Sequence, residues 1–258
     1  MEDVQNRLDT RQMPINRVGI KDISHPIKVI RKDGSETSSV ATFSMSVALP
    51  HDKKGTHMSR FVEMLNESET VVSAKSFNNM LSRMVKKLEA EAGFIEMQFP
   101  FFIEKTAPVS GVKGLMDYQV NLTGQIEQGQ VLSTLEVTVP VKSLCPCSRD
   151  ISEYGAHNQR SHITVGINTS RDVWLEDVIK AVESQASAEL FAILKRPDEK
   201  YITEKAYDNP KFVEDVVRDV ANVFDQNDHV TRYYVHAENF ESIHNHSAFA
   251  LIDVDKTI

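Results

Sequence analysis

The order of hydrophobic periods along the chain is the feature that most limits its fold. Pairs of segments with alternating apolar residues, typical of strands, stand before and after stretches whose apolar residues recur at helical spacing. The strand segments are residues 25–32, 41–49, 94–104, 114–122, 130–141, 161–168, 230–240 and 246–254. The helical segments are residues 58–66, 74–92 and 171–194 and a helix opening at Asn209-Pro210. This order predicts an α+β fold with antiparallel strand pairs and helices on one face.

The same order, β-β-α-α-β-β, occurs once in each half of the chain. It predicts two tandem modules, residues 23–128 and residues 129–258, the second carrying most of the chemically distinctive motifs. Residues 1–22 have no sustained period and are interpreted as an N-terminal arm. One α+β domain with a long middle sheet is the alternative interpretation.

Charge and hydropathy exclude two classes of partner. The 258 residues include 37 Asp and Glu against 29 Lys and Arg, a formal net charge of -8, and no block rich in Lys or Arg. Nucleic-acid backbones are therefore not expected as partners, because phosphate neutralisation needs a basic face. The N-terminus is polar, and no apolar run approaches the roughly 18 residues of a membrane span. A cytoplasmic protein without a membrane partner is expected.

The only two cysteines, Cys145 and Cys147, lie one residue apart. A disulfide between them would be strained and would close almost no loop, so metal binding or catalysis is the favoured explanation, with burial as small apolar side chains as the alternative. Strand alternation puts Ser143 on the same side as both thiols, which predicts that they line one pocket. Pro140 and Pro146 predict that the segment leaves the sheet nearby.

His157 lies in a polar loop, residues 152–160, that follows the cysteines. A loop of this length can fold back and bring an imidazole beside a thiolate. These two groups are half of a zinc site; a catalytic site adds a third protein ligand, here expected to be a carboxylate, and keeps one position for water. His162 falls on the polar side of the next strand, where a solvated or hydrogen-bonding role is expected.

A second polar cluster, residues 236–246, contains three of the nine histidines and two glutamates at the bend between the last two strands. Glu241 and His244 are close enough in sequence to act on one ligand as carboxylate and proton carrier. Solvated turn histidines are the alternative. Glu214 stands near the start of a predicted helix, where a negative charge is favourable in any protein.

Four motifs in the second half of the chain resemble a known family. They are Ser143-Leu-Cys-Pro-Cys-Ser148, Lys195-Arg-Pro-Asp-Glu-Lys200, Phe212-Val-Glu-Asp215 and Asn239-Phe-Glu-Ser-Ile-His-Asn-His246. Asp9-Thr-Arg-Gln12 and Ile20-Lys-Asp22 extend the likeness to the opening residues. Together they resemble GTP cyclohydrolase I of type IB, a family of the tunnelling-fold superfamily.

The resemblance implies a fold, an assembly and a reaction. Tunnelling-fold modules assemble through their sheets into barrels, and type IB subunits resemble two modules in tandem that form homotetramers with sites between subunits. The implied reaction uses GTP and water: the guanine imidazole ring is opened, formate is released, and rearrangement gives 7,8-dihydroneopterin triphosphate. This is the first step of tetrahydrofolate biosynthesis.

The resemblance also implies roles for residues. Cys145, His157 and Glu199 would hold one divalent metal per site, Zn²⁺, Mn²⁺ or Fe²⁺, with Glu241 as the rival for the third position and Cys147 beside the metal as a proton-transfer residue. Glu214 would anchor the purine edge, and Glu241 and His244 would surround the reacting ring. Positive charge for the triphosphate is available from Arg149, Arg160, Lys195, Arg196 and Lys200.

Three other functions are consistent with parts of this pattern. A nitrile reductase of queuosine synthesis pairs a nucleophilic cysteine with NADPH and needs no metal for hydride transfer. An archaeal-type cyclohydrolase stops at a cyclic phosphate product. A non-catalytic assembly protein stapled by a metal would unfold on chelation rather than merely lose turnover.

Overall fold

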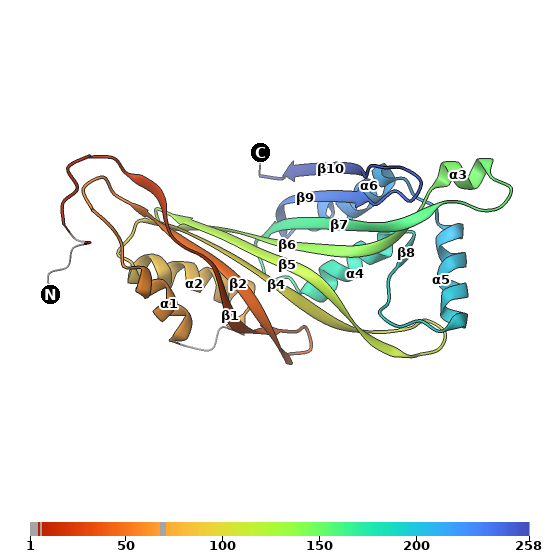
Figure 1. Ribbon diagram of the computed structural model, residues 1–258, viewed down its shortest axis with the longest axis horizontal. Helices are drawn as coiled ribbons and strands as arrows, with labels where there is room; N and C mark the ends of the chain where they lie inside the picture. The colour runs from red at the N-terminus through yellow and green to blue at the C-terminus, as the bar shows by residue number, and fades with distance from the viewer. Residues whose placement is uncertain (1–4, 6, 68–70, 258) are drawn as a thin grey trace. The chain divides into compact units, whose positions relative to one another are not determined.

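The computed structural model describes residues 5, 7–67 and 71–257, which form an α+β fold with one large sheet (Figure 1). The strands of this part of the chain are β1 (Ile15–Ile30), β2 (Glu36–Leu49), β3 (Val71–Val72), β4 (Ala92–Thr106), β5 (Lys113–Glu127), β6 (Gln130–Leu144), β7 (Asn158–Thr169), β8 (Ala188–Glu189), β9 (Val230–Asn239) and β10 (Ala248–Asp255). The helices are α1 (Met58–Asn66), α2 (Ala74–Lys87), α3 (Pro146–Ile151), α4 (Leu175–Gln185), α5 (Arg196–Asp208) and α6 (Val213–Asp225).

The element order confirms the predicted α+β class. The first half runs β1, β2, α1, α2, β4, β5, with the two-residue strand β3 between its helices. The second half runs β6, β7, then α4, α5 and α6, then β9 and β10, with α3 and β8 as short additions. Strand β1 pairs antiparallel with β2, β2 with β4, β6 with β8, β7 with β9 and β9 with β10, whereas β3 pairs in parallel with β1.

Packing divides the chain into two compact units. Unit 1 comprises residues 1–100 and 120–135, and unit 2 comprises residues 101–119 and 136–258. Strands β4, β5 and β6 contribute residues to both units. These limits differ from the sequence-based modules, residues 23–128 and 129–258, which meet at the turn between β5 and β6.

In unit 1 the strand order is β6-β5-β4-β2-β1-β3, and helices α1 and α2 pack against each other. The side chains of Phe61, Phe77 and Leu81 from these helices are almost completely buried. Ser73 caps α2, because its hydroxyl accepts the Ser76 N–H while the Ser76 hydroxyl accepts the Ser73 N–H. The alternating apolar residues of the strands and the stripes of the two helices thus share one core.

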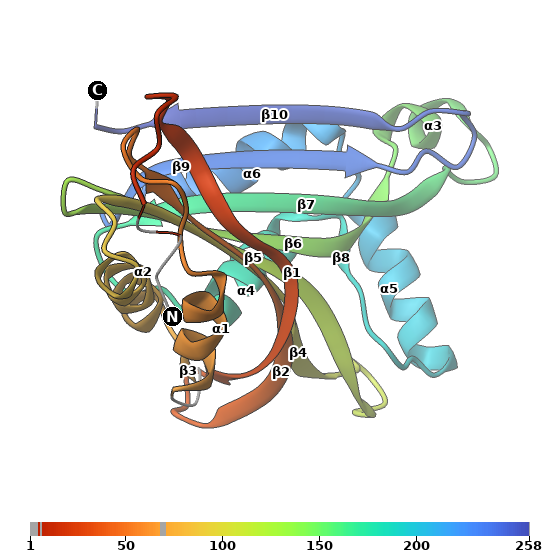
Figure 2. The same ribbon diagram turned by 60° about the vertical axis from the view of Figure 1, so that its left-hand side comes forward.

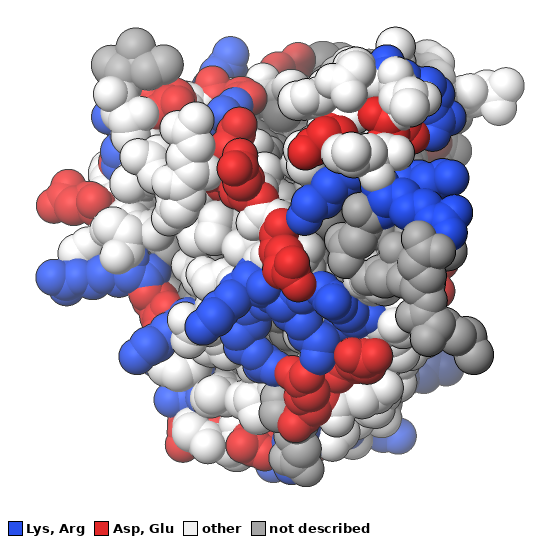
Figure 3. All heavy atoms as spheres, turned by 90° about the vertical axis from the view of Figure 1, so that its left-hand side faces the viewer, with Lys and Arg blue, Asp and Glu red and all other residues white. Residues whose placement is uncertain are grey.

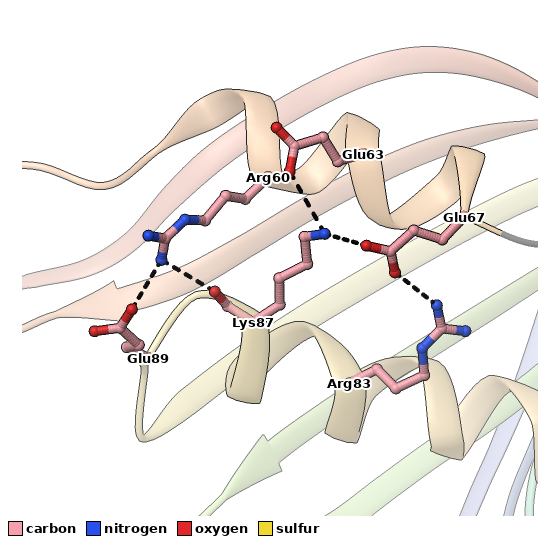
Figure 4. A network of polar contacts seen from close by, with 6 residues as sticks. All are labelled: Arg60, Glu63, Glu67, Arg83, Lys87 and Glu89. Atoms are coloured by element: carbon pink, nitrogen blue, oxygen red, sulfur yellow. Dashed lines mark hydrogen bonds and ion pairs between the residues drawn. The ribbon is translucent and has the colours of Figure 1, made fainter.

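A network of ion pairs joins α1 to α2 on the outside of unit 1 (Figure 4). Lys87 pairs with Glu67 and, at 3.5 Å, with Glu63, and Arg83 pairs with Glu67 at 3.2 Å. Arg60 donates to Glu89 and to the Lys87 carbonyl oxygen, both at 3.1 Å. On one face of the molecule, basic side chains gather near the middle and acidic side chains border them (Figure 3).

In unit 2 the strand order is β10-β9-β7-β6-β5-β4, and β8 pairs with β6. Helix α6 packs on β9 and β10 and against α4, as Figure 2 shows. The apolar stripe predicted for α6 is buried: Val213, Val216, Val217, Val220 and Phe224. The ring of Tyr234, on β9, packs over Gly166 of the neighbouring strand β7, and its hydroxyl donates a hydrogen bond to Glu136 of β6.

The N-terminal segment is more ordered than predicted. Strand β1 begins at Ile15, so residues 15–22, predicted to belong to an arm, pair with the end of β2, as Ile15 does with Leu49. The alternation is interrupted by irregular register between Ile15 and Val18 and again between Ile20 and Ile23, which hides the period in the sequence. Residues 1–4 and 6 of the predicted arm lie outside the described residues.

The helices of the second half correct the prediction in two places. The single helix predicted over residues 171–194 ends at Gln185, and a separate helix, α5, follows β8. Asn209 does not open a helix; it closes α5, and its side-chain amide donates to the Ala186 carbonyl oxygen at 2.9 Å. None of the helices in the described part of the chain is long and apolar enough to cross a membrane.

Candidate active site

Cys145 stands at the junction of β6 and α3. Strand β6 continues past Pro140 to Leu144, so that proline does not end the strand, whereas Pro146 is the first residue of α3. Strand alternation therefore does not extend to Cys147, contrary to prediction. Both thiols are free; Cys145 is partly buried and Cys147 is exposed.

The loop after α3 folds back on Cys145. The Cys145 N–H donates to the His157 carbonyl oxygen at 3.2 Å. The Ser148 hydroxyl accepts the His157 N–H at 3.1 Å and donates to the Cys145 carbonyl oxygen at 3.2 Å. Three hydrogen bonds thus hold the backbones of Cys145 and His157 together and show that the loop folds back, whereas the placing of the imidazole beside the thiol stays a prediction.

Glu241 reaches the same imidazole from the bend after β9. Its Oε2 lies 3.7 Å from His157 Nδ1, and only 11% of the Glu241 side chain and 13% of the His157 side chain are exposed. The Phe240 N–H donates to the Arg160 carbonyl oxygen at 3.1 Å, which aligns the bend with the start of β7. The structure therefore brings one of the two rival carboxylates to His157.

Glu199, the other rival, lies exposed in the first turn of α5 and forms no ion pair with His157. The opposite end of α5 meets α3, where the Arg149 guanidinium lies 4.9 Å from the centre of the Tyr207 ring. Eight residues separate Tyr207 from Glu199, about 12 Å along a helix. Among the described residues, no three His, Cys, Asp or Glu side chains form a group able to hold a metal ion.

The first turn of α5 is fixed by Asp198, whose side chain is fully buried. Its carboxylate accepts the backbone N–H groups of Val109, Ser110 and Lys195 at 2.8 Å, and the Ser110 hydroxyl at 2.5 Å. Burial acts to raise the pKa of Asp198, but these hydrogen bonds outweigh it and hold the pKa well below its usual range. Glu199 therefore projects from a firmly anchored helix end.

The remaining predicted residues are exposed. Glu214 lies in the first turn of α6, just after a linker in which the Lys211 N–H donates to the Leu144 carbonyl oxygen at 3.1 Å. This bond brings the start of α6 to the strand end that carries Cys145. The ring of His244 stacks on that of His246, with centres 5.1 Å apart.

The sequence analysis did not assign hydrogen-bonding roles to four polar residues around His157. His157 Nδ1 lies 3.1 Å from Gln159 Oε1, and Gln159 Nε2 donates to Ser143 Oγ at 3.0 Å. Ser143 and Ser161 share a hydrogen bond of 2.8 Å, and Ser161 donates to Asn239 Oδ1 at 2.7 Å. The sequence did contain one signal, a serine at an inward-facing position of each strand, Ser143 in β6 and Ser161 in β7. A buried hydroxyl is normally hydrogen-bonded, so such serines indicate buried partners.

The family model for type I GTP cyclohydrolase folE2 matches residues 1–250. The chain belongs to this family. GTP cyclohydrolase FolE2 of Azoarcus sp. (strain BH72) is 60% identical over 257 residues, 99% of this chain and 96% of that protein. GTP cyclohydrolase FolE2 of Thiobacillus denitrificans (strain ATCC 25259 / T1) is 59% identical over 256 residues, 99% of this chain and 95% of that protein.

Solved structures extend this family's likeness to more distant proteins. Urate oxidase from Bacillus sp. TB-90 aligns with a TM-score of 0.55 and 8% sequence identity, covering 94% of this chain and 100% of that one. Uricase from Arthrobacter globiformis aligns with a TM-score of 0.50 and 7% identity, covering 93% of each chain. At such low identity the likeness concerns the fold alone, and it supports the tunnelling fold expected for a FolE2 cyclohydrolase.

Proposed function

We propose that the residues around Cys145 and His157 form the active centre of this GTP cyclohydrolase I. The enzyme opens the imidazole ring of GTP by hydrolysis, releases formate and yields 7,8-dihydroneopterin triphosphate for tetrahydrofolate biosynthesis. The proposal of the site rests on one observation: hydrogen bonds hold the backbones of Cys145, from the Cys-Pro-Cys motif, and of His157, whose side chain is largely buried, together at one end of β6. Glu241 adds a carboxylate to the pair.

One divalent metal, Zn²⁺, Mn²⁺ or Fe²⁺, is proposed for each site. The types of donor fit such an ion, since Cys145 offers sulfur, His157 offers nitrogen and Glu241 adds a carboxylate beside His157. Bound there, the metal would supply Lewis-acid activation of water at neutral pH. Cys145 and His157 are the proposed ligands from this cluster.

The third ligand is proposed to be Glu199, as the family motif implies, with Glu241 as its rival. Glu241 contacts the imidazole at Nδ1, whereas Glu199 is held at the start of α5 by its buried neighbour Asp198. Metal content of the Glu199→Gln and Glu241→Gln variants separates the two. The true ligand is the one whose amide variant loses metal as Cys145→Ala does.

Proton transfers are assigned to Cys147, His244 and Glu241. Ring opening, formate loss and ribose rearrangement each need a group that takes up or gives up a proton near neutral pH. The Cys147 thiol is exposed and stands in the first turn of α3, two residues after Cys145. His244 follows Glu241 in the exposed segment between β9 and β10.

Glu214 is proposed to select guanine. A carboxylate accepts two N–H bonds from the guanine edge, and adenine would leave these acceptors unpaired. Its exposed position at the start of α6 leaves it accessible to a substrate. The triphosphate is proposed to lie near the basic side chains that flank the same elements: Arg149, Arg160, Lys195, Arg196 and Lys200.

A homotetramer with barrels closed by sheet pairing, working in the cytoplasm, completes the proposal. Strand β10 is at the end of the strand order and has exposed apolar side chains at Phe249, 70% exposed, and Leu251, 58% exposed. An edge strand of this kind is a template for pairing with another chain. Sites between subunits would let a neighbouring chain supply phosphate ligands, so a catalytically competent monomer would contradict this part.

The test is incubation of metal-reconstituted protein with GTP. Formate is measured directly and pterin fluorescence is measured after oxidation, with a chelated sample and a Cys145→Ala variant alongside. Formation of formate and neopterin triphosphate, lost in both controls, is the expected result. If GTP survives with zinc, manganese and iron alike, the proposed centre is wrong, and nitrile reduction with NADPH is the next assay.

A further inference from the structure

A chain of hydrogen bonds runs from β9 to the loop that carries His157. Ser161 Oγ donates to Asn239 Oδ1 at 2.7 Å, Ser143 and Ser161 share a bond of 2.8 Å, and Gln159 Nε2 donates to Ser143 Oγ at 3.0 Å. Ser143 and Ser161 are each 2% exposed and Asn239 is 5% exposed. Water therefore has little access to these groups, and they satisfy one another.

The order of donors in this chain follows from the number of protons available. A hydroxyl has one proton, and an amide oxygen has none. Ser161 uses its proton on Asn239 Oδ1, so in the bond between the two serines Ser143 must be the donor. The Ser143 oxygen then accepts from Gln159 Nε2. This sequence of bonds fixes which end of the Gln159 amide faces the serines.

The other end of that amide faces His157. Gln159 Oε1 lies 3.1 Å from His157 Nδ1 and can only accept a hydrogen bond, so Nδ1 must carry the proton. We propose that Gln159 is a positioning residue that holds neutral His157 as its Nδ1–H tautomer and leaves the Nε2 lone pair free to bind the metal. Metal-binding histidines commonly donate their second ring N–H in this way.

The same assignment separates the roles of the two rival carboxylates. Glu241 Oε2 lies 3.7 Å from Nδ1, the nitrogen that carries the proton, and not from the nitrogen with the free lone pair. Glu241 is therefore a second acceptor for the Nδ1–H group or a group that faces substrate. The third metal ligand would come from the Nε2 side of the ring, which argues against Glu241 in that position.

The tautomer is measured on the metal-free full-length protein by long-range ¹⁵N–¹H correlation of ¹⁵N-labelled histidines at alkaline pH. The His157→Gln variant identifies the His157 signals. A protonated Nδ1 and an unprotonated Nε2 are expected. The opposite tautomer would mean that the amide of Gln159 is reversed and donates to His157, and it would overturn the proposal without any assay of activity.

Two substitutions of Gln159 test the positioning role. Gln159→Leu removes the acceptor, so we expect a mixture of tautomers and a metal affinity about 10- to 100-fold lower. Gln159→Glu keeps an acceptor at Nδ1, and its second oxygen can accept the Ser143 hydroxyl proton at the cost of the bond between the two serines, so it should retain the Nδ1–H tautomer and near-normal affinity. Equal metal affinity in both variants would contradict the proposal, and if Gln159→Leu fails to fold, the tautomer of the unmodified protein still decides it.

The metal half of this inference rests on the proposed active centre, and the two can fail separately. An Nδ1–H tautomer in a protein whose Cys145→Ala variant keeps its metal and its activity would refute the proposed centre and leave the role of Gln159 in orienting His157. An Nε2–H tautomer in an enzyme that loses metal with Cys145→Ala would refute the positioning role and leave the centre.

Discussion

Two polar networks, one in each unit, are built in opposite ways. On unit 1, helices α1 and α2 are joined by charged side chains in water; those of Glu67 and Arg83 are each 48% exposed. Behind His157 in unit 2, neutral groups such as Ser143 and Ser161 are buried and bonded one after another. Exposed ion pairs impose no donor-to-acceptor order on one another, and water can replace either partner. A buried chain of hydroxyls and amides has a direction and fixes the protonation of what it touches.

Substitutions in the two units should differ most in their effect on GTP cyclohydrolase activity. His157→Ala in unit 2 removes a proposed metal ligand, and we expect the rate of formate release to fall about 1000-fold or more. His51→Ala, at an exposed position of unit 1, is the matched control and should leave the rate within about twofold. Steady-state assays of both variants check this, and comparable losses would remove the functional distinction between the units.

Asp198→Asn should cause the largest loss of stability. An amide cannot accept all the hydrogen bonds now made to the carboxylate, so the Tm should fall by about 5–10 °C. Because the pKa of Asp198 is lowered in the fold, its contribution is present above the ordinary value of 3.8 and is lost as the pH falls through the folded-state pKa. Thermal scans at neutral and acidic pH test this, with Asp208→Asn at the exposed end of α5 as control.

Gly166→Ala should be the next most damaging change. A Cβ at this position would clash with the Tyr234 ring and push its hydroxyl from Glu136. We expect a loss of about 1–3 kcal/mol in the free energy of unfolding. Gly55→Ala in unit 1, where an added Cβ would meet ordinary contacts, should change it by less than about 1 kcal/mol. Urea unfolding compares the two, and equal losses would show that Tyr234 can move aside.

Glu67→Gln should have the smallest effect, lowering the Tm by no more than about 3 °C. The hydrogen bond from Lys87 lowers the pKa of Glu67, so its contribution is present above the ordinary value of 4.5 and disappears as the pH falls through the folded-state pKa. The difference from the unmodified protein should also shrink in high salt. A difference that persists in acid or in high salt would contradict the view that unit 1 relies on exchangeable surface charges.

Regular periods made most of the fold predictable. Helix α1 begins and ends at the predicted residues. Helix α5 was missed because its buried side is short and partly polar, formed by Asp198, Ile202 and Ala206. Helix propensity cannot predict that Asp198 is buried, because its hydrogen-bond partners Val109 and Ser110 lie far away in sequence, between β4 and β5.

The candidate site was predictable where sequence neighbours make it. Cys145 and His157 are close in sequence, and the short segment between them folds back so that their backbones meet. The direction of the hydrogen bonds that run through Gln159 and Ser161 could not be predicted from the sequence, because it depends on Asn239, 78 positions after Ser161. Spacing alone also left open whether Glu199 or Glu241 is the third ligand, and only the fold shows that Glu241 lies beside His157.

The carboxylate of Asp198 also bears on how long the enzyme lasts once made. Its hydrogen bonds join Asp198 to Ser110 and Val109, which are 88 and 89 positions away in sequence. These bonds can form only after a long loop has closed, with the loss of conformational entropy that closure entails. A contact that forms late is largely absent from the folding transition state. We therefore expect its loss to accelerate unfolding much more than it slows refolding. The anchoring of α5 would then govern the lifetime of the folded enzyme rather than the speed of its formation.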